Sequence, residues 1–205
     1  MTLGDIKAQA LQLMGFEEYV DGENIELYED DDNWGPLIRP MWHAVNRCFA
    51  DLETKRVLPL KRAALVDGKG RGSWRTFYYG DVSDLFEVVR VVVENDSYVD
   101  DDHPFLLDEV GYLRIMDFDV GADYAVLYRP RLKPLTSISG NDTVIPLPEV
   151  LAAAVPYWVK SEVYRVDEPD EAGEARNLYE AAVEQYAARA EIGRQGVVQT
   201  VYALP

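Results

Sequence analysis

The spacing of apolar residues changes twice along this chain, and these changes limit the folds that it can adopt. Near both ends, apolar residues recur every three or four positions, which is the period of an amphipathic helix. Between about residue 60 and residue 135, aromatic and β-branched residues concentrate and turn signals recur at short intervals, as in strands. The sequence therefore predicts an α+β fold, a helical bundle interrupted by a β-rich, sandwich-like insertion.

Two helices are predicted in the N-terminal part. Thr2 and Asp5 form a capping pattern, and the apolar face that follows ends before Gly15. A clearer helix is predicted from Pro36 to about residue 56, because apolar residues recur there at steps of four and three: Leu37, Met41, Val45, Cys48 and Leu52. The polar and acidic residues 17–34 predict a solvated loop or a weak further helix.

The middle of the chain contains the predicted strands. Asp67 and Gly68 suit a hairpin turn that leads into a strand at 74–79. Residues 85–93 contain five valines, which favours a strand, although charged residues at helical spacing weaken that interpretation. Further strands are predicted at 112–116 and 124–128, where side chains alternate in character.

The helical period returns near the C-terminal end. One helix follows Pro148, and its apolar face contains Leu151, Val155, Trp158, Val159 and Val163, with Pro156 expected to kink or break it. A last helix is predicted at 170–192, with Leu178, Ala182 and Tyr186 facing inward. The predicted divisions are residues 1–57 for the N-terminal helices, 58–139 for the β insertion, 140–192 for the C-terminal helix pair, and 193–205 for an extended docking tail.

Composition restricts the function classes. The 205 residues include 37 acidic and 20 basic ones, for a formal net charge of −17, so the surface lacks the positive excess that nucleic-acid binding requires. The same repulsion would suit a channel that DNA passes through without being held. Cys48 is the single cysteine, so the fold depends on its core, and we expect maturation in a reducing compartment, without a secretory signal or a membrane span.

The residues that could carry chemistry point to ordinary structure instead. Residues 100–103 (Asp-Asp-Asp-His) could attract a cation, but no second ligand group follows, so we expect a solvated loop. Cys48 could be a nucleophile with His43 or His103 as base, yet it occupies an apolar helix position. The glycines of 68–73 lack the spacing of a phosphate-binding loop. We therefore predict no catalytic residue, cofactor or metal, and a protein that is not an enzyme.

The order of these features resembles the head-to-tail adaptor (connector, or neck) proteins of tailed bacteriophages. The resemblance is strongest in the C-terminal half, at the strand 123–130, the extended link through Ile138, and the sequence Ile145-Pro146-Leu147-Pro148-Glu149. A helix pair at 150–164 and 172–186 then follows, separated by an acidic turn at 167–169. Residues 41–49 and 56–59 are similar to proteins encoded near neck genes in prophages of Gram-positive gut bacteria.

This resemblance implies a structural virion subunit in the neck, folded and assembled in the cytoplasm of a bacterial host. Such subunits assemble as a ring, commonly a dodecamer, under the portal protein, where they extend the DNA channel and join tail components or a second neck protein. It further implies portal contact through a C-terminal arm, with candidates Val197, Val198, Val201, Tyr202 and Leu204. Two alternatives remain open: a carbohydrate-binding or tail-accessory module in which Trp74, Tyr78 and Tyr79 line a groove, and a carboxylate- or metal-dependent phage enzyme.

Overall fold

The computed structural model describes residues 1–16, 21–22, 24–66, 68–69, 74–94, 101–107, 111–119 and 121–202, with the backbone alone described for Glu94, Asp101 and 191–202. The chain divides into a helical unit, Met1–Val57 with Pro134–Pro205, and a β unit, Leu58–Lys133. The predicted mixture of helices and antiparallel sheets is confirmed, whereas sandwich-like packing of the sheets stays a prediction.

The second boundary between the units lies earlier than the predicted residue 139. Asn46 explains this, because its side-chain amide donates to the carbonyl of Leu135 at 2.8 Å and its side-chain oxygen accepts from the Leu135 amide at 2.8 Å. These two bonds attach the segment after Lys133 to the helical unit.

The N-terminal helices begin and end at residues whose local chemistry explains them. Helix α1 (Leu3–Leu13) starts with the predicted capping box, in which Thr2 and Asp5 exchange two side-chain hydrogen bonds of 2.8 and 3.2 Å. The single helix predicted from Pro36 is wrong, because the structure has a short α3 (Gly35–Ile38) and a separate α4 (Met41–Thr54). Pro40 separates them, since it has no amide hydrogen to donate into a continuing helix.

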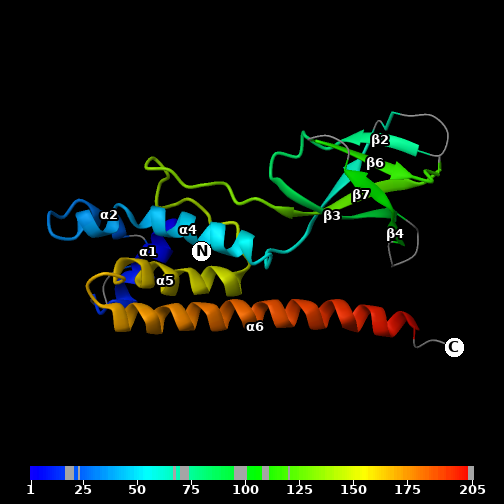
Figure 1. The fold of residues 1–205 in the computed structure, drawn as a ribbon. Coiled ribbons are helices and arrows are strands. Elements are labelled where there is room, and N and C mark those ends of the chain that lie inside the picture. The colour runs from blue at the N-terminus through cyan, green and yellow to red at the C-terminus, as the bar shows by residue number, and fades with distance from the viewer. Residues whose placement is uncertain are drawn as a thin grey trace. The chain divides into compact units, whose positions relative to one another are not determined.

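Helix α5 (Glu149–Val163) lies at the centre of the helical unit. It contacts α1, α4 and α6 (Pro169–Tyr202), and Figure 1 shows α5 and α6 side by side and antiparallel. The predicted inward face is confirmed for Leu151, Val155, Trp158 and Val159, all of which are buried. The helix continues through Pro156, which is itself buried.

The inward face of α6 differs from the prediction by one position. Leu178 is 49% exposed, and the buried residues are Ala172, Ala175, Tyr179 and Val183. Hydrophobicity alone favours leucine over tyrosine for a buried position. In the structure, Tyr179 is buried because its hydroxyl has an acceptor across the bundle, Asp51, and because the two alanines allow close approach of the helices.

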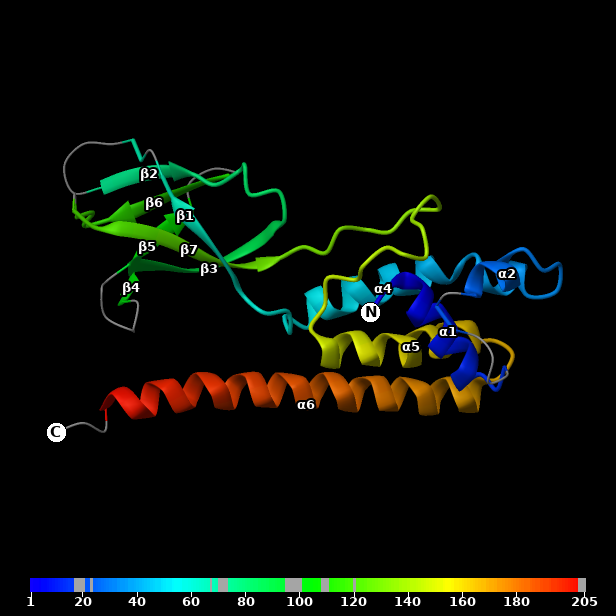
Figure 2. The ribbon, with the colours of Figure 1, turned by 180° about the vertical axis from the view of Figure 1, so that it is seen from behind.

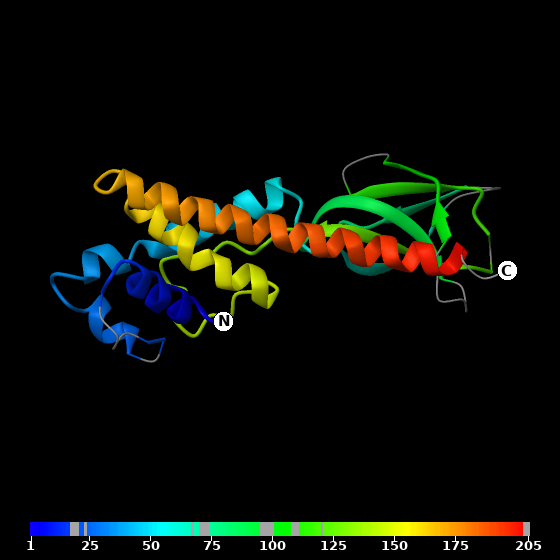
Figure 3. The same ribbon diagram turned by 90° about the horizontal axis from the view of Figure 1, so that it is seen from below.

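The extended tail predicted for 193–205 is wrong for the described part of that segment. Helix α6 continues to Tyr202, past the end of α5, as Figures 1 and 3 show. Residues 184–192 are mostly good helix formers, and a glycine such as Gly193 costs a helix only about 1 kcal/mol relative to alanine. The sequence prediction assumed that the helix ends before Gly193. The helix instead continues through this glycine.

The β unit contains two antiparallel sheets (Figure 2). One has the order β1-β7-β3-β4 and the other the order β2-β6-β5. The bounds are β1 (Lys61–Leu65), β2 (Trp74–Tyr78), β3 (Leu85–Glu94), β4 (Asp101–His103), β5 (Phe105–Leu107), β6 (Tyr112–Met116) and β7 (Asp123–Pro130). Side chains of both sheets form one core: Phe77, Val91, Leu113, Ile115, Tyr124, Val126 and Tyr128.

Two local predictions in the β unit can be compared with these strands. The hairpin turn at 67–72 lies mostly outside the described residues, but Lys69 and Thr76 exchange two backbone hydrogen bonds of 2.9 and 2.7 Å, so an antiparallel pairing leads into β2. The loop predicted at 100–103 is wrong for Asp101–His103, which form β4 against β3. Pairing with the valine-rich β3 outweighs the weak strand propensity of aspartate.

Candidate functional site

The outer face of the β2-β6-β5 sheet presents a group of large side chains that are not covered by the described chain. Strand register places Trp74 opposite Met116, Tyr78 opposite Tyr112, and Arg114 opposite both Thr76 and Leu106. We call these seven residues the aromatic face. They lie on one side of the sheet because side chains alternate along a strand, and the intervening Phe77, Leu113 and Ile115 point into the core.

The aromatic face is held in a defined arrangement. The Tyr78 and Tyr112 rings lie 4.8 Å apart, and the Arg114 guanidinium lies 4.9 Å from the centre of the Trp74 ring. Five of its side chains are between 38% and 55% exposed, namely Trp74, Tyr78, Leu106, Tyr112 and Met116. Together they leave roughly 400 Å² of mostly apolar surface in contact with water, which is in the range of the largest exposed apolar patch on a soluble monomer, a patch that is often functional.

The sequence prediction identified part of this face. Trp74 and Tyr78 were expected on an exposed groove and are on the face, but Tyr79 is not, because it packs against the core of the β unit. The contributions of β5 and β6 were missed. The alternation of Tyr112, Leu113 and Arg114 repeats that of β2, and this was the available signal.

A second exposed surface lies in the helical unit at residues 26–34, which we call the acidic segment. It contains Glu26, Asp30, Asp31 and Asp32, no basic residue, and two exposed apolar side chains, Leu27 at 76% and Trp34 at 38%. Asp31 accepts hydrogen bonds from the amides of Asn33 and Trp34, so it shapes the turn before α3. Glu26, Asp30 and Asp32 are exposed to solvent.

A polar cavity of about 510 Å³ lies beside the same segment within the helical unit. One of its lining residues, Lys7, is only 4% exposed and is bound by the side chains of Glu29 and Asn141, the latter at 2.8 Å. Asn141 also donates to Glu29 at 3.0 Å, which closes a triangle. This triangle neutralises the buried ammonium and fixes the loop around Asn141 to α1 and α2 (Ile25–Glu29). The remaining lining residues are Glu26, Asp30, Arg39, Trp42, Ser137, Ile138, Ser139 and Gly140.

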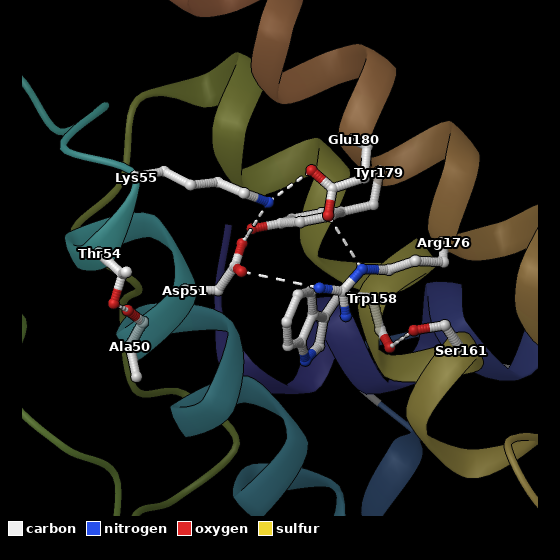
Figure 4. A network of polar contacts seen from close by, with 9 residues as sticks. All are labelled: Ala50, Asp51, Thr54, Lys55, Trp158, Ser161, Arg176, Tyr179 and Glu180. Carbon is white, nitrogen blue, oxygen red and sulfur yellow. Dashed lines mark hydrogen bonds and ion pairs between the residues drawn. The ribbon is translucent and has the colours of Figure 1, made fainter.

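Figure 4 shows a third polar cluster, between α4, α5 and α6. The Tyr179 hydroxyl donates to Asp51 at 2.7 Å, and Asp51 also binds Lys55 at 2.7 Å. Arg176 binds Glu180 at 3.0 Å, and its guanidinium lies 3.7 Å from the centre of the Trp158 ring. Opposite charges balance in this cluster, and Tyr179 is fully buried, so it joins helices and offers no reactive group to a substrate.

Cys48 lies next to this cluster and is fully buried, as its apolar helix position predicted. Burial raises the pKa of its thiol to about 12. A hydrogen bond with Tyr179 acts in the opposite direction, but burial has the larger effect. The thiol is therefore protonated at neutral pH and is not activated as a nucleophile. The proposed partner base His43 is exposed and stacks on Trp42, with ring centres 3.5 Å apart.

The two described side chains of the predicted cation cluster, Asp102 and His103, each have a separate partner. Asp102 forms an ion pair with Arg90 at 2.5 Å, and the His103 ring contacts the carbonyl of Met116. Asp100 lies outside the described residues, and Asp101 is described by its backbone alone. Within the described ranges, no group of three His, Cys, Asp or Glu residues could hold a metal ion.

The predicted portal-contact residues all lie near the C-terminal end. Val197, Val198, Val201 and Tyr202 lie in α6, where the backbone alone is described, and Leu204 lies outside the described residues. Within the described ranges, no helix has the length and apolar character that crossing a membrane requires. A scan against protein-family models finds no match to this chain, and a search of curated proteins finds no significant match either.

Proposed function

We propose that this chain is a structural subunit of a tailed-bacteriophage neck, a head-to-tail adaptor that forms a ring under the portal protein. In this function the ring extends the DNA channel, and tail components attach to it. The observation that carries the proposal is the length of α6. It spans 34 residues, or about 50 Å at 1.5 Å per residue, against 15 residues for its partner α5. Its last turns extend beyond α5 and are suited to reach another chain.

The distribution of charge supports the same function. The formal charge of −17 disfavours tight binding to phosphates, so DNA could move past such a surface without being held. Basic side chains of the helical unit are often engaged by neighbouring carboxylates, as Lys7 is by Glu29 and Lys55 by Asp51 and Glu180. These ion pairs further reduce the positive charge that a polyanion would meet.

The portal contact is assigned in this proposal to the last turns of α6. Val197, Val198, Val201, Tyr202 and Leu204 are the candidate residues. Because the described backbone there is helical, we expect the end of α6 to bind as a helix in a groove and not as the extended tail that the sequence predicted.

Electron microscopy and co-sedimentation with purified phage portal rings test the proposal. The full chain should form rings that sediment with portal rings. The variant V197D/V201D should stay folded and lose this binding. Q199D, which places one similar charge in the same segment, is the control and should retain it. Failure of the full chain to bind portal rings, or equal binding by V197D/V201D, would refute the proposed adaptor function.

The exposed aromatic face favours one alternative, a carbohydrate-binding or tail-accessory module. Trp74, Tyr78 and Tyr112 provide flat rings with polar edges, and sugars stack on such rings. In that case the chain would bind glycans without forming a ring, and Trp74→Ala would abolish binding. Glycan-array binding by the purified chain, measured beside the portal experiment, distinguishes the two functions.

A further inference from the structure

We propose that strand β1 of one copy pairs with strand β4 of the next copy, so that the four-stranded sheets of neighbouring subunits join edge to edge. The inference rests on the proposed adaptor function for the expectation that copies assemble, and it names the two strands through which neighbouring subunits meet. These strands are the two edges of the β1-β7-β3-β4 sheet. We call β1 (Lys61–Leu65) the basic edge and β4 (Asp101–His103) the acidic edge.

Within the described part of the chain, each of these edges has a paired strand on one side only. The basic edge pairs with β7 and the acidic edge pairs with β3. On the outer side of an edge strand, alternate amides and carbonyls point away from the sheet, where an added strand can bind them. The edge at β2 in the other sheet differs, because Thr76 exchanges two backbone hydrogen bonds with Lys69 on its outer side.

The direction of the strands favours a head-to-tail contact between copies. All three pairings in this sheet are antiparallel, so its two edges run in opposite directions. When a second copy is placed beside the first in the same orientation, its β1 therefore meets β4 in an antiparallel pair, and the sheet continues from copy to copy. A contact of this kind closes into a ring when the rotation between copies allows. Pairing of β1 with β1 would instead need a two-fold axis and would end at a dimer.

The faces of the two edges also match. Ala63 packs against the core of the β unit, so Arg62 lies on the opposite face of the sheet. On the acidic edge, Asp102 pairs with Val92, which is adjacent to the core residue Val91, so Asp102 lies on that opposite face too. Pairing Arg62 with Asp102 of the next copy therefore keeps the core faces of both sheets on the same side.

The charges of the two edges favour this pairing over the pairing of like edges. The basic edge contains Lys61 and Arg62 and no acid, whereas the acidic edge contains two aspartates and a histidine. Opposite charges on neighbouring strands stabilise a sheet, and like charges directly opposite destabilise it. Two acidic edges centred on each other would place Asp102 opposite Asp102, so that pairing is disfavoured.

A hollow beside the acidic edge leaves room for an incoming side chain. Its volume is about 370 Å³, and it is lined by residues 89–91 and 102–105. The ion pair between Arg90 and Asp102 is exposed there, with 64% of the Asp102 side chain open to solvent. A carboxylate accepts several hydrogen bonds, so Asp102 can bind Arg62 of the next copy and keep Arg90. The contact therefore does not require an unpaired charge.

The shortness of the acidic edge implies that a single contact is weak. β4 has three residues and β1 has five, so their pairing adds only a few backbone hydrogen bonds, each of which contributes modestly in water. Two copies alone should therefore associate weakly. In a closed ring each copy makes the contact twice, and the combination of contacts stabilises the assembly.

Disulfide formation between copies of the full chain tests the contact. The variants R62C and D102C are purified separately, mixed and mildly oxidised. Residues directly opposite in an antiparallel pair lie about 4.5–5.5 Å apart between Cα atoms, a separation that a disulfide can span. The mixture should give a covalent dimer on a non-reducing gel, and the double variant R62C/D102C should give a ladder of larger oligomers. The native Cys48 is fully buried and serves as the internal background.

A matched control places the second cysteine on another edge. Leu106 is 55% exposed on β5, the three-residue edge strand of the other sheet. A mixture of R62C and L106C should form no more dimer than either variant alone. Circular dichroism of each variant checks that the fold is retained.

A second pair of variants leaves Arg62 and Asp102 unchanged. Ala64 is exposed on the same face as Arg62 and lies diagonal to Asp102 of the next copy in the expected pairing. In sedimentation velocity at about 100 µM, A64D should weaken the association of copies roughly twofold to fivefold, because it adds a like charge beside the acidic edge. A64K changes the same position with the opposite charge and should associate at least as well as the wild type.

Several results would overturn the inference. They are the absence of a dimer in the mixture of R62C and D102C, an equal dimer in the L106C control, and equal association of A64D and A64K. A disulfide that closes within one R62C/D102C chain would show that the two edges meet inside a single copy and would overturn it too. If portal rings bind a chain whose edges do not cross-link, this inference fails and the adaptor function stands. If copies cross-link through β1 and β4 but do not bind portal rings, the adaptor function fails and the strand contact stands.

Discussion

Replacing Tyr179 by phenylalanine tests whether the polar cluster of Figure 4 holds the helical bundle together. The change removes one hydroxyl, which donates to Asp51 at 2.7 Å, and leaves the buried ring in place. A hydrogen bond to a charged acceptor contributes about 1.5–3 kcal/mol to stability.

The structure places the expected loss at the lower end of this range. Asp51 keeps Lys55 at 2.7 Å and Arg176 at 3.6 Å, so its carboxylate retains partners after the hydroxyl is removed. We expect the free energy of unfolding to fall by about 1.5 kcal/mol. With a denaturant slope of about 2 kcal/mol/M, the urea midpoint of the helical signal should fall by roughly 0.7 M.

The assay is urea unfolding at pH 7, followed by circular dichroism at a helical wavelength. Tyr186→Phe, at a half-buried position of the same helix, is the matched control and should change stability by less than about 0.5 kcal/mol. A Tyr179→Phe protein as stable as the wild type, or a control that is equally destabilised, would refute the role assigned to this hydroxyl.

Three further predictions concern the helical unit. In urea unfolding, Val183→Ala should destabilise it by about 1–3 kcal/mol, because Val183 is buried. Leu178→Ala should cost less than about 0.5 kcal/mol, because Leu178 is exposed. Equal losses of stability in the two variants would contradict the observed register of α6. The Cys48 thiol has a pKa of about 12 when folded, above its ordinary value of 9.0, so the folded state holds this proton more tightly and stability should fall as pH rises from 9 towards 12. In the Cys48→Ala variant, the stability measured by thermal unfolding should fall less steeply between pH 9 and 10 than in the wild type. An equally steep fall in both proteins would contradict this prediction. Asn141→Ala should cost about 1–3 kcal/mol by removing an acceptor from buried Lys7, and a neutral result in the same urea assay would oppose the structural role of the triangle.

Local rules predicted the elements that depend on neighbours in the sequence. The capping box at Thr2 requires residues three positions apart, and the buried face of α5 follows from a period of 3.6 residues. The split between α3 and α4 was equally local. Pro40 is visible in the sequence, and its missing amide hydrogen was the signal that the prediction overlooked.

The candidate surfaces required the strand pairing and the register. Nothing in the sequence states that β2 pairs with β6, so Trp74 and Arg114 could not be joined before that pairing was known. The expected groove included Tyr79 because it is adjacent in sequence to Tyr78. The side chain instead packs on the core, because the two neighbours point to opposite faces.

The amino-acid sequence by itself determined the α+β class, the strongly negative charge, the helix cap and the inward face of α5, because each follows from composition or from residues within one or two turns. Tertiary structure decided which side of α6 is buried, and which polar groups meet. Asp51 and Tyr179 are separated by 128 positions and Lys7 and Asn141 by 134. Such bonds form only after the chain has brought distant segments together, so no local pattern encodes them.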